Sequence, residues 1–166
     1  MDVLYDFISP AAFWTTLLSL HMLASVGLLG AVTHQALAAL APAPRGAGDG
    51  VLNRARRVSG PVYAGAVCLL WVLAFLLGGW IYVHYRIYVR VPIEAEGYWL
   101  TLGAFEVKEH VAVLGLGLLP LYWLSWQRPR DAGYAAARRW TTGLLAAMTW
   151  LLFLVGHVVN NVRGFG

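Results

Sequence analysis

The sequence has 166 residues, of which 60% are apolar and only 12% are charged, and its mean hydropathy is +0.64. Soluble globular domains average about 45–50% apolar and about 25% charged residues, so this composition excludes a soluble enzyme, a disordered chain and, despite a pI near 9.5, a nucleic-acid binder. The length fits one domain over residues 1–166, and the single cysteine, Cys68, excludes a disulfide framework.

Four stretches of the chain are long and apolar enough to cross the hydrocarbon core of a bilayer, which takes about 20 helical residues. Ser9-Pro10 and Ser59-Gly60-Pro61 are typical helix starts, because proline is favoured in the first turn. Pro120 lies inside the third stretch and predicts a kink, and Pro92 is expected to close an extension of the second. The expected spans cover residues 11–41, 62–85, 102–126 and 141–162.

Short connections between the stretches predict antiparallel neighbours. The expected fold class is therefore an all-α membrane protein, a four-helix transmembrane bundle with up-down topology. Eight of the twelve basic residues lie in the 42–60 and 127–140 loops, and loops rich in arginine stay in the cytoplasm. Both termini are then on the outer side, and we expect a bacterial inner (plasma) membrane protein. Its outer end is polar, whereas its inner half is expected to be almost purely apolar.

Ionisable residues at membrane depth indicate function, because burying them in hydrocarbon costs a few kcal/mol or more. The five histidines are distributed over all four spans: His21, His34, His84, His110 and His157. Counting helical rise puts His110 and His157 roughly 8–10 Å below the outer boundary, and His21 roughly 15 Å below it. His84 lies at the boundary. His34 lies deep, with no expected partner at its depth, and is interpreted as structural.

The third span adds carboxylates near its outer end. Glu106, Glu109 and His110 have spacings that put them on one helical face, whereas Lys108 is expected to point elsewhere, towards the outer interface. Arg86 and Arg90 follow His84 at the same end of the bundle. The outer end therefore combines imidazoles, carboxylates and guanidinium groups.

Three interpretations of these residues stay open. In the first, two histidines from different helices are axial ligands of haem b: His110 with His157, or His84 or His21 as alternates. One haem or two would then be held, and Arg86, Arg90 or Arg163 would pair with the propionates. No covalent haem attachment motif is present.

The second interpretation is a non-haem site for iron, zinc or copper, built from mixed carboxylate and imidazole ligands. Its candidate ligands are His84, Glu106, Glu109, His110 and His157. The third interpretation is a non-catalytic subunit of a larger membrane complex, in which each histidine is a structural residue.

The pattern resembles small four-helix membrane b-type cytochromes and, in part, small membrane proteins associated with haem–copper oxidase assembly. Both place histidines on successive helices and have an arginine-rich loop before the last span. The residues that carry the resemblance are His84, Glu109-His110, Pro120, Ala137-Arg138-Arg139 and His157. The resemblance implies an electron-transfer protein, a component of a membrane oxidoreductase, that exchanges electrons with quinone or with other respiratory or redox subunits.

Overall fold

The computed structural model describes residues 8–44, 46 and 48–162, and within these ranges the chain is helical and contains no strand. The long helices are α2 (Pro10–Leu40), α4 (Gly60–Tyr88), α6 (Trp99–Gln127) and α7 (Ala135–Val162). Shorter elements lie between them: α3 (Val51–Ala55), α5 (Arg90–Ala95) and the 3-10 helix η1 (Ala132–Tyr134). The all-helical expectation is confirmed. Arg45, which is one of the loop arginines, Arg163 and both chain termini lie outside the described residues.

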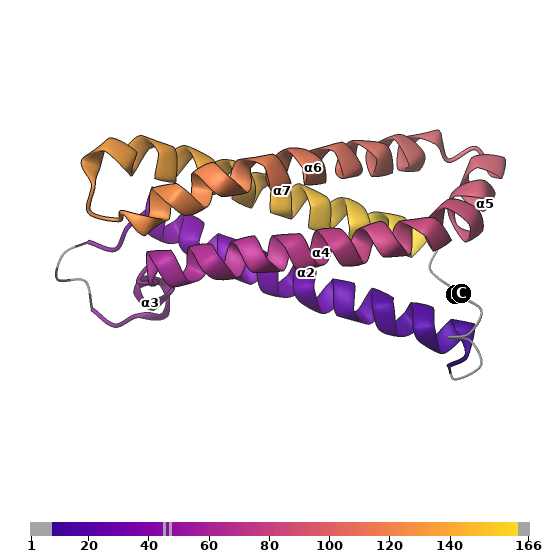
Figure 1. The fold of residues 1–166 in the computed structure, drawn as a ribbon, viewed down its shortest axis with the longest axis horizontal. Coiled ribbons are helices and arrows are strands. Elements are labelled where there is room, and N and C mark those ends of the chain that lie inside the picture. Colours follow the sequence, from indigo (N-terminus) through magenta and orange to yellow (C-terminus); the bar gives the residue numbers. More distant parts are fainter. Residues whose placement is uncertain (1–7, 45, 47, 163–166) are drawn as a thin grey trace.

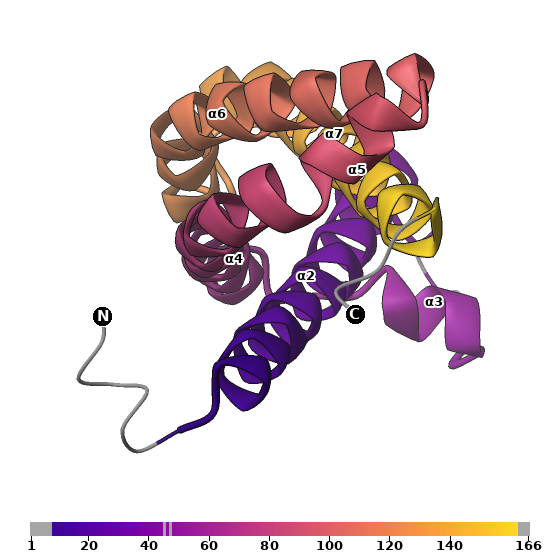
Figure 2. The same cartoon turned by 90° about the vertical axis from the view of Figure 1, so that its right-hand side faces the viewer.

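Each long helix packs against its neighbours along the chain, α2 on α4, α4 on α6 and α6 on α7, and α7 returns to contact α2. Figure 1 shows these helices running side by side, with α3 at one end of the bundle and α5 at the other. We call these the α3 end and the α5 end. Seen from the α5 end, the first turns of α2 diverge from the other long helices (Figure 2).

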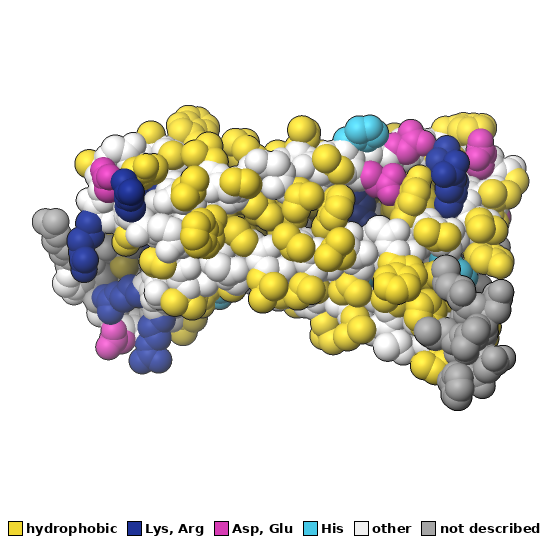
Figure 3. Space-filling model, viewed as in Figure 1, with side chains coloured by type: hydrophobic (Ala, Val, Ile, Leu, Met, Phe, Trp, Pro, Cys, Tyr) yellow, Lys and Arg dark blue, Asp and Glu magenta, His cyan; other side chains and the backbone are white. Residues whose placement is uncertain are grey.

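Much of the outer surface of the bundle is apolar. Leu23, Leu69 and Leu76 are 64%, 60% and 61% exposed, and hydrophobic side chains are spread over the middle of the view in Figure 3. Three segments are long and apolar enough to cross a membrane: Pro10–Leu40, Gly60–Tyr88 and Ala132–Asn161. An apolar surface of this extent is unfavourable in water and favourable in lipid. The chain therefore has the character of an integral membrane protein.

Helix α6 has the same length as α4, 29 residues, but is not among these three segments. The reason is its first half, where Glu106, Lys108 and Glu109 lie within one turn and lower the apolar character of the helix. The helix continues through Pro120 as one element. Its other half is apolar and packs between α4 and α7.

The helix ends agree with the predicted signals in part. The Ser9 hydroxyl accepts a hydrogen bond from the Ala12 amide at 3.3 Å, as expected of an N-cap before Pro10. Ser59 occupies the N-cap position of α4, but its side chain makes no capping bond. Pro92 does not close an extension of α4, because it lies inside the separate helix α5. Helix α7 begins at Ala135 rather than at residue 141.

The bundle core is organised around two indole rings that lie on glycines of neighbouring helices. The ring of Trp71 on α4 lies against Gly115 on α6, and the ring of Trp126 on α6 lies against Gly60 at the start of α4. A side chain at either glycine would overlap the ring. Small residues therefore bring α4 and α6 close together, as is common between membrane helices.

Candidate functional site

Charged side chains of α5 and α6 meet at the α5 end of the bundle. Arg90 contacts Glu106 through Nη2 and Oε1 at 3.2 Å, and its Nε lies 3.9 Å from Glu94. The chain reverses between α5 and α6 at Gly97, whose φ of +77° lies in the region that favours glycine. This reversal brings Arg90 back over the first turns of α6. Figure 3 shows acidic, basic and histidine side chains gathered at this end.

An aromatic stack lies directly beneath this ion pair. The rings of Tyr85 and Phe105 are 3.9 Å apart and nearly parallel, and Tyr82 lies 6.4 Å from Phe105 in the same orientation. Between these rings and the carboxylates is a small pocket of about 10 Å³, which has room for about one water molecule. The residues that line it are Tyr82, Tyr85, Arg90, Leu102, Phe105, Glu106 and Glu109.

His110 and His157, the first expected ligand pair, both lie on the exposed surface of their helices. The Nδ1 of His110 is 2.7 Å from the Glu106 carbonyl oxygen, one turn back on α6. Its N–H therefore donates to that carbonyl, and Nε2 keeps a lone pair. His157 is linked to the end of its own helix, because its carbonyl accepts a hydrogen bond from Asn161 at 2.8 Å.

His84 lies between two aromatic rings near the end of α4. Its ring centroid is 4.6 Å from that of Trp14 on α2 and 4.5 Å from that of Tyr88. The imidazole is thus part of an aromatic contact between α2 and α4. Arg86, in the last turn of α4, is exposed at the same end.

The side chain of His21 connects α2 to α4 inside the bundle. Its Nδ1 donates to the Ala74 carbonyl of α4 at 3.0 Å. The ring lies beside Gly78, and a Cβ at that position would be 3.1 Å from the imidazole Cε1. Histidines that bind metals usually donate their other ring nitrogen to a carbonyl or carboxylate in this way. His21 is therefore oriented, with Nε2 as the nitrogen that keeps a lone pair.

Lys108 was expected to point to the outer interface, but its side chain lies against α7. Its ammonium nitrogen lies 5.0 Å from the centroid of the Phe105 ring and would be 3.3 Å from a Cβ on Gly156 of α7. His21 and Glu109 both lie near this ammonium group. The absence of a side chain at Gly156 gives the lysine its space. The prediction for Lys108 is wrong because the rotation of α6 about its own axis directs residue 108 towards α7.

The structure brings part of the predicted site together. Arg90, Glu106 and Glu109 line one pocket, and His110 is bonded to the turn that carries them. Within the described ranges, no group of three or more His, Cys, Asp or Glu side chains is arranged to hold a metal ion. The proposed non-haem ligands, His84, Glu106, Glu109, His110 and His157, are thus not gathered into one centre.

The half of the bundle towards the α3 end, which was expected to be almost purely apolar, also contains buried polar side chains. Gln35 and Tyr122 are fully buried near the α3 end. The Tyr122 hydroxyl donates to the Gln35 side-chain oxygen, and Gln35 Nε2 donates to the Gly60 carbonyl at 3.0 Å. Trp126 donates to the Thr142 hydroxyl at 3.0 Å. These hydrogen bonds join all four long helices. In the sequence, the one signal for them is Gln35, a polar residue within an apolar run.

Comparison with protein-family models, with curated proteins and with solved structures gives no match to this chain.

Proposed function

We propose that this chain is an integral membrane electron-transfer protein that spans the bilayer four times and binds haem b through imidazoles. The fourth span in this proposal is α6, which is as long as α4 and packs between α4 and α7. Its charged turn lies in its first half, towards the α5 end. A membrane helix tolerates such residues where they face other helices or the interface.

The observation that carries the haem proposal is the orientation of His21. Its Nδ1 is bonded to the Ala74 carbonyl, so its Nε2 has the lone pair that a haem iron requires. The absence of a side chain at Gly78 lets the imidazole lie against α4. The donor chemistry of the chain fits haem b, because His110 also has its Nδ1 bonded to a carbonyl. His21 would be one ligand of the haem iron and His84, His110 or His157 would be the other, with one haem as the simplest count.

When bound, haem b supplies a one-electron couple whose potential depends on its ligands and burial. The residues of the chain bind it and set its surroundings. The Ala74 carbonyl fixes the rotation of the His21 ring, and Lys108 adds a positive charge nearby. Arg90 is paired with Glu106, so the exposed Arg86 is the better partner for a propionate.

We assign the exchange of electrons with quinone, or with other redox subunits, to the α5 end. Glu106 and Glu109 lie beside the stacked rings of Tyr85 and Phe105, where a carboxylate can accept a proton from a bound quinol. The arginine-rich α3 end is then cytoplasmic, and both termini are outside.

A reduced-minus-oxidised absorption spectrum of the purified protein tests this proposal. We expect a sharp α band and a pyridine haemochrome at about one haem per chain. His21→Ala should abolish the band, and single variants of His84, His110 and His157 should identify the second ligand. The matched control is His34→Ala, which should keep it. A folded protein that contains no haem when produced with haem available contradicts the proposal and favours a non-catalytic subunit.

A further inference from the structure

A second polar region, which the haem proposal does not use, lies at the α3 end. Helix α3 lies beside the last turns of α2 and the first turns of α4, and an open groove of about 400 Å³ is left between them. Its lining residues are His34, Val51, Arg54, Ala55, Arg57, Val58, Ser59 and Tyr63. His34 was expected to be a structural residue without a partner at its depth, but it lines this groove together with two arginines.

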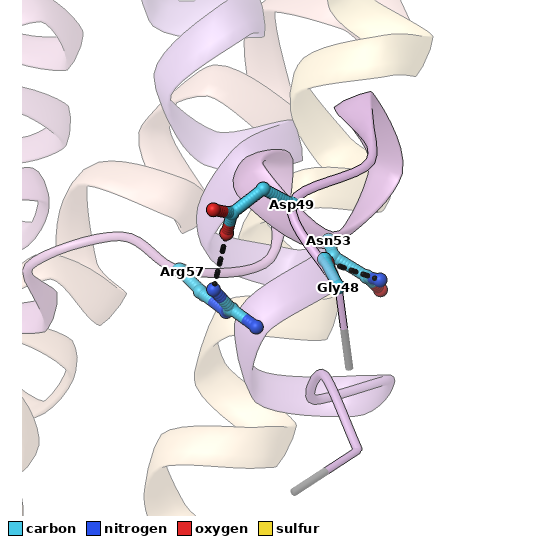
Figure 4. A network of polar contacts seen from close by, with 4 residues as sticks. All are labelled: Gly48, Asp49, Asn53 and Arg57. Carbon is cyan, nitrogen blue, oxygen red and sulfur yellow. Dashed lines mark hydrogen bonds and ion pairs between the residues drawn. The ribbon is translucent and has the colours of Figure 1, made fainter. Parts of the chain in front are cut away.

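The groove is held in shape by contacts on both sides. His34 Nδ1 donates to the Ala55 carbonyl at 3.3 Å, which ties α2 to α3, and the Tyr63 ring meets the imidazole edge to face at 6.4 Å. On the other side, Arg57 forms an ion pair with Asp49 at 3.0 Å, and Asn53 donates to the Gly48 carbonyl at 3.0 Å (Figure 4). The segment before α4 is therefore braced by side chains.

The polar wall of the groove is cationic. Arg54 and Arg57 both line it, and among the described residues the Arg54 side chain has no hydrogen bond or ion pair. The Ser59 hydroxyl makes no capping bond to α4 and is available to a ligand. A guanidinium group is planar and binds phosphate through two parallel N–H donors. This combination of donors fits a phosphate better than a carboxylate, because a phosphate offers more acceptor oxygens.

The other wall of the groove is apolar and continues onto the outer surface. It includes Val51, which is 87% exposed, together with Ala55 and Val58. The groove also lies where two candidate spans end, at Leu40 and at Gly60, which is the headgroup level of a bilayer. A ligand that carries both a phosphate and hydrocarbon matches both walls.

We infer that this groove binds an anionic phospholipid, with Arg54, Arg57 and Ser59 at the phosphate and the acyl chains along Val51 and Val58. This inference goes beyond the haem proposal and does not depend on it, because the groove lies at the opposite end of the bundle from the paired Arg90 and Glu106. The phosphate chemistry alone would also suit free inorganic phosphate. The apolar wall favours the lipid.

The test is native mass spectrometry of the full chain in a neutral detergent, titrated with three probes. These are phosphatidylglycerol, phosphatidylcholine with the same acyl chains, and inorganic phosphate. We expect phosphatidylglycerol to bind in preference to phosphatidylcholine, and inorganic phosphate not to compete. Arg54→Gln should weaken phosphatidylglycerol binding about tenfold or more, the range for loss of a charged hydrogen bond. Arg54→Lys should retain part of the affinity.

The matched control is Arg139→Gln, which removes the same charge from an exposed position on α7 at the same end of the bundle. It should leave the affinity within about twofold. An equal loss in both variants shows non-specific charge attraction and overturns the inference. Full competition by inorganic phosphate, or equal binding of both lipids, also overturns it. Unchanged haem content in Arg54→Gln separates this result from a failure of the haem proposal.

Discussion

Trp71 shows how one side chain sets the spacing of two helices. The Trp71 ring is 2% exposed and lies on Gly115 of α6. Its indole N–H donates to the carbonyl of Ala112, which is also on α6, at 3.3 Å. The contact therefore combines close packing with a hydrogen bond across the α4 and α6 interface. Buried indole groups usually need such a partner for their N–H.

Gly115→Ala should destabilise the protein, because the added methyl group overlaps the Trp71 ring. Overpacking of this kind costs about 1–3 kcal/mol, only partly offset by the higher helix propensity of alanine. The measurement is thermal unfolding in one detergent. Gly117→Ala is the control, since a Cβ there meets nothing within 4 Å, and it should be neutral or slightly stabilising. Equal midpoints for the two variants would contradict the packing described here.

The connection between α6 and α7 depends on one arginine. Arg138 donates through Nη1 to the carbonyls of Ser125 at 3.2 Å and Arg128 at 2.9 Å, and through Nη2 to Asp131 at 3.0 Å. The last carbonyls of a helix have no partner within it, and an arginine side chain can supply one. The early start of α7 at Ala135 is what brings Arg138 back against the end of α6.

Arg138→Gln should loosen the segment between α6 and α7, because these carbonyls lose their charged donor. We expect amide hydrogen exchange over residues 128–134 to become about tenfold faster, which corresponds to about 1.4 kcal/mol. Arg139→Gln serves as the control, since residue 139 is exposed. If both variants exchange at the wild-type rate, the three hydrogen bonds contribute nothing to the connection.

The helices could be predicted because each depends on a local signal. Runs of apolar residues and the Ser9-Pro10 start define α2 without reference to the rest of the chain. The site could be predicted only in part, because helix rotation is not encoded in spacing along one helix. Glu106 and Glu109 were expected together and line one pocket, whereas Lys108 turned out to face α7. The bond between Tyr122 and Gln35 joins residues 87 positions apart, and no local pattern indicates it.

At the scale of the molecule, the polar groups divide between two ends separated by an apolar middle. Acidic residues with Arg90 lie at the α5 end, and arginines dominate the α3 end (Figure 3). The four-span proposal requires these ends to lie on opposite sides of the bilayer. The positions of the two ends of α6 test this requirement directly, because α6 is the fourth span of the proposal and is not among the three apolar segments.

Cysteine labelling tests the proposed crossing and its direction. In a Cys68→Ser background, Leu100→Cys lies at the start of α6, where the side chain is 88% exposed, and Arg130→Cys lies just after its end. An impermeant maleimide should label Leu100→Cys on intact cells and Arg130→Cys only after permeabilisation. Labelling of both from the same side would show that α6 does not cross.

The inward position of Lys108 has a consequence for the exterior of the protein. Lys108 is the one lysine among the twelve Lys and Arg residues of the sequence, so the other eleven are arginines. Guanidinium groups stay protonated even in strongly alkaline solution. The attraction between the arginine-rich end and acidic headgroups should therefore weaken with added salt while staying constant as the medium is made more alkaline.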